Sequence, residues 1–143
     1  MVEMDKKETY ETYTLPDVLV EEIMTKDVLN VDREDTLDDL IAMFRAHSVH
    51  GFPVLYEGKL VGMVTKIDLL KIFQRTGFRD TLVSHVKDIM RTHPTSIGPK
   101  SHIIDAVDTM IRQGFRLLPV LKEDTLIGVI SYTDIINQVL KKP

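Results

Sequence analysis

Two aspartates stand at matching places in the sequence, each closing a Gly-x-x-(Thr/Ser)-x-x-Asp pattern. The two patterns are Gly62 to Asp68 and Gly128 to Asp134. A carboxylate can accept hydrogen bonds from two adjacent hydroxyl groups at once, and Thr65 or Ser131 adds a hydroxyl of its own. The same residue types also cap the start of a helix. The pattern therefore indicates hydrogen bonding to a polar ligand, helix capping, or both.

Two basic residues also recur at one position, since His50 and Arg116 each lie three residues before a proline. A guanidinium group matches the geometry of phosphate oxygens, and the first amides of a helix attract anions. His47 lies three residues before His50, but no cysteine or acidic cluster joins the pair, and the other histidines lack ligand spacing. These positions favour an anion over a metal ion.

Both patterns belong to a tandem repeat. Residues 20–73 align with residues 86–139 without a gap, at a constant offset of 66. We therefore expect a polar tail at 1–13, a first repeat at 14–75, a linker at 76–84 and a second repeat at 85–143. A pair of related units can simply bury each other's faces, and it also creates two related clefts at its seam.

Each repeat predicts the order helix, strand, helix, strand, strand, helix. The second helix of each is amphipathic, with apolar residues three and four positions apart. We expect helices near 18–24 and over 36–47, 67–74, 102–113 and 133–140, and strands over 28–31, 52–56, 60–65, 118–122 and 126–131. The fold class is α/β (α+β), with a small three-stranded sheet and flanking helices in each repeat, packed as a pseudo-two-fold pair.

Composition excludes several classes of protein. Lys and Arg number 18 against 22 Asp and Glu, so the chain lacks the basic excess of a nucleic-acid binder. Cysteine is absent, which excludes disulfides and thiol catalysis. No Ser–His–Asp set or phosphate-binding Gly-Lys-Thr loop indicates an enzyme. No stretch approaches the roughly 18 apolar residues of a membrane span, and the polar start lacks a signal peptide's features, so we expect a cytoplasmic protein.

The repeated pattern, together with the stretches before it, resembles the CBS domain. The stretches are His50 to Val54, Arg116 to Val120, Ile23 to Thr25 and Ile89 to Arg91. The resemblance covers nearly everything after residue 17, and two copies together are similar to the tandem pair called a Bateman module. It implies a regulatory module without catalytic activity or a catalytic cofactor, which binds an adenine nucleotide and acts on a separate effector protein that the sequence does not identify.

The resemblance also implies roles for individual residues. Asp68 and Asp134 would accept hydrogen bonds from ribose. The phosphate or hydroxyl contacts would come from Thr65, Ser131, His50 and Arg116, and the adenine wall from Thr25, Val28, Val49, Pro94 and Phe115. One cleft would join Asp134 and Ser131 to Thr25, Val28 and Val49; the other would join Asp68 and Thr65 to Pro94 and Phe115.

Some features depart from the family, and alternatives stay open. Gly51 and Leu117 stand where many members carry a second basic residue, which favours AMP or ADP over ATP. S-adenosylmethionine is an alternative ligand, and a ligand-free structural adaptor is an alternative function. The resemblance further implies a homodimer, which we expect to meet at Ile72, Phe73, Val139 and Leu140.

Overall fold

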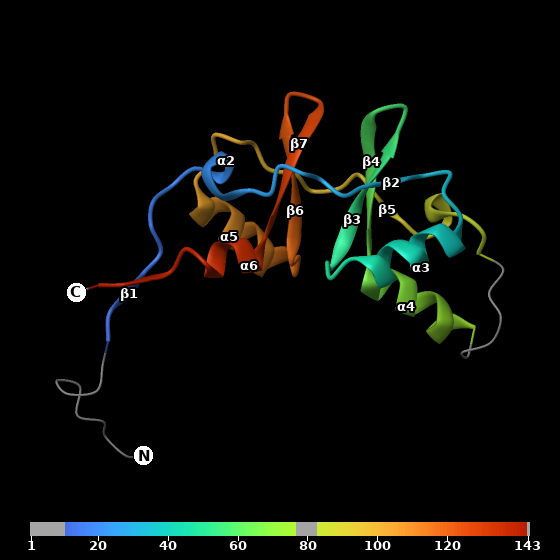
Figure 1. The fold of residues 1–143 in the computed structure, drawn as a ribbon, viewed down its shortest axis with the longest axis horizontal. Helices are drawn as coiled ribbons and strands as arrows, with labels where there is room; N and C mark the ends of the chain where they lie inside the picture. The colour runs from blue at the N-terminus through green and yellow to red at the C-terminus, as the bar shows by residue number, and fades with distance from the viewer. Residues whose placement is uncertain (1–10, 77–82, 143) are drawn as a thin grey trace, which may run out of the picture.

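A computed structural model describes residues 11–76 and 83–142. Two β-hairpins stand side by side at its centre, and helices lie beside each of them (Figure 1). The first half contains β1 (Tyr13–Thr14), α2 (Val20–Ile23), β2 (Val31–Asp32), α3 (Leu37–Ala46), β3 (Gly51–Tyr56), β4 (Lys59–Thr65) and α4 (Lys66–Arg75). The second contains the 3-10 helix η1 (Val86–Asp88), β5 (Arg91–Thr92), α5 (Ile103–Gln113), β6 (Leu117–Lys122), β7 (Thr125–Ser131), α6 (Tyr132–Ile136) and β8 (Leu140–Lys141).

The two halves exchange their opening segments. The first sheet has the order β2-β3-β4-β5, and its edge strand β5 comes from the second repeat. Arg91 of β5 pairs with Met63 of β4, and at the equivalent place Thr25 of the first repeat bridges to Val129 of β7. The expected three-stranded sheets are therefore corrected to a four-stranded and a two-stranded sheet. The segments equivalent to β2 and β5 make only single bridges in the second hairpin, Ile97 with Val120 and Thr25 with Val129.

The hydrophobic cores follow the same exchange. Val20 of α2 is buried with Ile103 and Leu118 of the second repeat, and Val86 of η1 is buried with Leu40 and Phe52 of the first. Burying one such aliphatic side chain contributes about 1.5–3 kcal/mol. Each core is thus completed by the other repeat, which fixes the two halves relative to each other.

The first glycine of each repeated pattern makes room for the crossing segment. A Cβ atom on Gly128 would lie 2.6 Å from the Met24 sulfur and 3.0 Å from the Thr25 carbonyl oxygen. A Cβ atom on Gly62 would lie 2.7 Å from the Arg91 carbonyl oxygen. The contact at Gly62 is with backbone and is too short for a larger residue, and the contacts at Gly128 are tight. Glycine at these positions therefore lets residues 91 and 25 approach the patterned strands.

The end of the chain differs from the prediction. The helix expected over 133–140 ends at Ile136, since the amides of Gln138 and Val139 donate to carbonyls only three residues back and tighten the turn. Leu140 instead pairs with Thr14 in the β1–β8 ladder. Residue 13 of the expected tail at 1–13 therefore belongs to strand β1. Residues 1–10 of that tail and residues 77–82 of the expected linker lie outside the described residues.

The other predicted helices are confirmed within a few residues as α2, α3, α4 and α5. The strand expected over 28–31 is found at Val31–Asp32 instead. Within the described parts of the chain, no helix combines the length and apolar character needed to cross a membrane.

Candidate functional site

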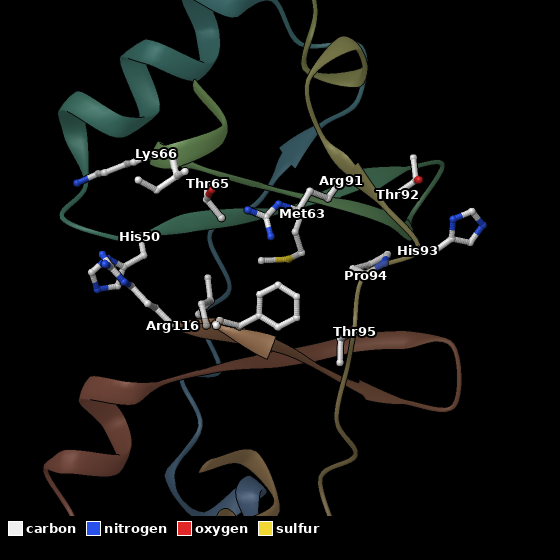
Figure 2. Close-up of a pocket in the computed structure, with 14 residues that line it drawn as sticks. His50, Met63, Thr65, Lys66, Arg91, Thr92, His93, Pro94, Thr95 and Arg116 are labelled. Atoms are coloured by element: carbon white, nitrogen blue, oxygen red, sulfur yellow. The ribbon is translucent and has the colours of Figure 1, made fainter. Parts of the chain in front are cut away.

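A cavity of about 500 Å³ lies between the two repeats (Figure 2). It is lined by five of the residues that the sequence predicted for ligand binding: His50, Thr65, Pro94, Phe115 and Arg116. This volume falls in the usual range for small-molecule sites, which is roughly 300–1,000 Å³. The residues come from both repeats, so the exchange of opening segments builds this first cavity.

The first cavity has a basic lining that the sequence analysis only partly anticipated. Lys66 and Arg91 line it as well as Arg116, and Figure 2 shows Arg91 and Met63 reaching inward from β5 and β4. Among the described residues that line it, none is acidic. Lys66 could have been found in the sequence because it directly follows Thr65 in the repeated pattern, whereas Arg91 needed the crossing of β5. The cavity is suited to an anion.

The start of α4 fixes the residues at one wall of the first cavity. The Thr65 hydroxyl accepts a hydrogen bond from the Asp68 amide at 3.2 Å, and the Asp68 carboxylate accepts one from the Thr65 amide at 2.9 Å. The Lys66 amide donates to the His50 carbonyl at 3.0 Å. Two of the first three helix amides therefore have protein partners, which weakens the simple anion site expected from the helix start.

Asp68 is held away from the first cavity. It is 7% exposed and is not among the lining residues. Its second carboxylate oxygen accepts a hydrogen bond from Arg91 Nε at 3.0 Å, which makes an ion pair between the two repeats. The predicted ribose acceptor of this cavity is thus engaged by a neighbouring guanidinium.

His50 lies where the two repeats meet, and its ring contacts that of Tyr132 edge-on with 5.1 Å between centroids. Burial lowers the pKa of His50, and the positive charges of Arg116 and Lys66 lower it further. Figure 2 shows His50 and Arg116 meeting at the same end of the cavity. His50 is therefore biased toward its neutral form until a negative charge enters.

A second cavity of about 250 Å³ occupies the equivalent place on the other side of His50. Its lining includes the predicted residues Thr25, Val49, Ser131 and Asp134, together with Asp27, which the sequence analysis missed. Val28 is half-buried and does not belong to this lining. Asp134 accepts a hydrogen bond from the Ser131 amide at 2.8 Å and donates its own amide to the Ser131 hydroxyl at 3.1 Å.

Comparison with known proteins identifies the architecture. The sequence profile of the CBS domain matches residues 20–75 and 86–141. The chain is 32% identical to the uncharacterized protein MJ0188 of Methanocaldococcus jannaschii over 126 residues, which is 87% of this chain and 45% of that protein. It is 29% identical over 120 residues to the CBS domain-containing protein YhcV of Bacillus subtilis, covering 83% of this chain and 84% of that one.

A solved structure agrees with these relatives. The crystal structure of CBSX2 in complex with AMP superposes with a TM-score of 0.75 at 26% identity, covering 83% of this chain and 93% of that one. The chain spans less than half the length of MJ0188, so more than half of MJ0188 has no counterpart in the match. The profile match, the exchanged repeats and the shared fold lead to one conclusion: the chain belongs to the CBS domain family and carries two of its domains in tandem.

Proposed function

We propose that this CBS pair is a regulatory module that binds an adenine nucleotide in its first cavity and passes the ligand state to a partner protein. The observation that carries this proposal is the combination of an apolar wall, at Pro94 and Phe115, with the cations of Lys66 and Arg116 in one cavity of about 500 Å³. An aromatic face binds the base of a nucleotide by stacking, and cations bind the phosphate of the same nucleotide. The AMP complex of the similar protein CBSX2 supports the same ligand class.

In this proposal Arg116 and Lys66 contact the phosphate, with His50 beside them. Asp134 accepts the ribose hydroxyls of a ligand in the second cavity, where one of its carboxylate oxygens already bonds the Ser131 amide. Phe115 and Pro94 form the adenine wall of the first cavity, and Val49 and Thr25 that of the second.

The choice among nucleotides rests on charge. The missing second basic residue at Gly51 and Leu117 favours AMP or ADP, whereas Lys66 and Arg91 supply cations for a longer phosphate chain. ATP and S-adenosylmethionine are therefore arms of the test. Thermal unfolding with each compound separates a ligand-binding module from a structural adaptor, because a ligand that binds only the folded state raises the melting temperature. An unchanged melting temperature with all four compounds would favour the adaptor.

We also predict that the module forms a homodimer through α4 and α6. Leu70 and Ile136 occupy equivalent positions in the two helices and are 60% and 65% exposed, so two copies of one apolar site face solvent in the single chain. Ile72, which the sequence predicts at the dimer seam, is 1% exposed and belongs to the core instead, because α4 turns this residue inward. Leu140 lies in β8, outside α6.

Light scattering at micromolar concentration should therefore return twice the chain mass, and Leu70→Lys together with Ile136→Lys should return the mass of one chain. A single-chain mass for the unmodified protein would refute the dimer.

A further inference from the structure

The pseudo-two-fold relation makes Arg91 and Thr25 equivalent, since they are separated by the same offset of 66 residues as the repeats. Both lie where an opening segment crosses to the other repeat: Arg91 beside Met63 and Thr25 beside Val129. Arg91 contacts Asp68, which closes the pattern of the facing repeat, and Thr25 lines the same cavity as Asp134. A long cation occupies this place at the first cavity, and a short hydroxyl residue occupies it at the second.

Arg91 changes the first cavity in two ways. Its Nε donates to Asp68 Oδ1 at 3.0 Å, and Asp68 Oδ2 already accepts bonds from the amide and hydroxyl of Thr65 at 2.9 Å each. Both carboxylate oxygens are thus occupied. The Arg91 guanidinium carbon lies 5.8 Å from the centre of the Phe115 ring, at the wall of the cavity.

The second cavity has the opposite character. Of the described residues that line it, Asp27 and Asp134 are acidic and none is lysine or arginine. Thr25 is uncharged and so cannot form an ion pair with Asp134, and only one Asp134 carboxylate oxygen has a hydrogen-bond partner among the described residues. This carboxylate can accept a hydrogen bond from a ligand hydroxyl group, but its negative charge repels a phosphate.

We propose that Arg91 is the specificity-determining residue that sorts ligands between the two cavities. By holding Asp68 and adding its charge to Lys66 and Arg116, it makes the first cavity select a phosphorylated nucleoside. The second cavity, with Thr25 in its place, selects a nucleoside that carries no phosphate. This inference rests on the proposed function for its ligand class, and it goes further because it assigns different ligands to two cavities that the repeat makes equivalent.

The test is calorimetry on Arg91→Thr with AMP, adenosine and inorganic pyrophosphate. Removal of a charge-assisted contact should lower the affinity for AMP and for pyrophosphate about 10- to 150-fold, while the affinity for adenosine changes little. The ratio of AMP affinity to adenosine affinity therefore falls. Because Arg91→Thr also leaves the buried Asp68 without its ion pair, the double variant Arg91→Thr, Asp68→Asn removes both charges and guards against unfolding. It should also lose AMP affinity, but by less than Arg91→Thr alone, because no unpaired carboxylate remains to repel the phosphate.

Asp68→Asn alone provides the matched control. If Asp68 only holds Arg91 in place and does not contact ribose, the AMP affinity of Asp68→Asn should stay within about threefold of the unmodified protein. If Asp68 accepts a hydrogen bond from ribose, this substitution should lower the AMP affinity about 10-fold or more. An unchanged AMP-to-adenosine ratio in Arg91→Thr and in the double variant would overturn the inference while leaving nucleotide binding in place.

Pyrophosphate separates the two proposals. Binding of pyrophosphate but of none of AMP, ADP and ATP, with loss of pyrophosphate binding in Arg91→Thr, would refute the proposed function and support the charge sorting. Binding of none of these compounds would refute both.

Discussion

Asp134→Ala should weaken adenosine binding at the second cavity about 10- to 150-fold. The ribose would lose its charged hydrogen-bond acceptor, and one hydrogen bond to a charged acceptor contributes roughly 1.5–3 kcal/mol. The substitution also removes the acceptor for the Ser131 amide, so a matched control must carry the same local damage without touching a cavity. AMP binding at the first cavity should not change, and calorimetry with both ligands measures the difference.

Asp39→Ala is that control. Asp39 accepts a hydrogen bond from the Thr36 amide at 3.0 Å and donates its amide to the Thr36 hydroxyl at 3.1 Å, which repeats the arrangement of Asp134 and Ser131. It lines neither cavity. Both variants should lose a similar helix-capping contribution to the free energy of unfolding, about 0.5–2 kcal/mol. Only Asp134→Ala should lose affinity for adenosine. Equal adenosine affinity in the two variants would remove Asp134 from the site.

Arg116→Ala should reduce the preference for AMP over adenosine more than His50→Ala does at pH 8. An arginine side chain carries its charge at every pH used, whereas burial and the charges of Arg116 and Lys66 lower the pKa of His50. At pH 8 His50 therefore has no charge to lose. The expected loss in Arg116→Ala is about 10- to 150-fold for AMP, with adenosine nearly unaffected.

Lower pH should bring the two variants closer. A bound phosphate stabilises the protonated imidazole and raises the pKa of His50, so AMP binding should take up a proton at pH values between the lowered pKa of His50 in the free protein and its higher pKa in the complex. Titrations in buffers of different ionisation heat measure this uptake. The phosphate of AMP itself gains a proton near pH 6, but this contribution is common to all variants. His50→Ala should lack the extra uptake and Arg116→Ala should keep it. If neither substitution moves the AMP-to-adenosine ratio at any pH, these residues do not contact phosphate.

The elements whose structure is encoded locally could be predicted from the sequence. The amphipathic faces of α3 and α5 and the pairing of Thr65 with Asp68 depend on residues a few positions apart. The repeat is visible because the sequence aligns with itself without a gap. Five lining residues of the first cavity, His50, Thr65, Pro94, Phe115 and Arg116, were expected from the resemblance to the CBS domain, whereas Lys66 and Arg91 were not.

The remaining features depend on contacts between distant segments. The exchange that places Arg91 beside Met63 leaves no periodic mark in either repeat, so neither the four-stranded sheet nor the Arg91–Asp68 ion pair could be predicted. The end of the helix predicted over 133–140 differs from the structure for a similar reason. Its apolar spacing fits a helix, but the ladder between Leu140 and Thr14, together with the Lys141–Glu11 ion pair, favours an extended end.

The most direct test of nucleotide binding is a calorimetric titration of AMP into the unmodified chain and into Arg116→Glu. This substitution reverses one charge of the first cavity and leaves the Arg116 carbonyl, which accepts from the Tyr132 amide at 3.0 Å, in place. We predict a saturable heat of binding for the unmodified chain and none over the same concentrations for Arg116→Glu. Equal heats in both proteins, or no heat in either with AMP, ADP and ATP at millimolar concentration, would contradict a nucleotide site in the first cavity.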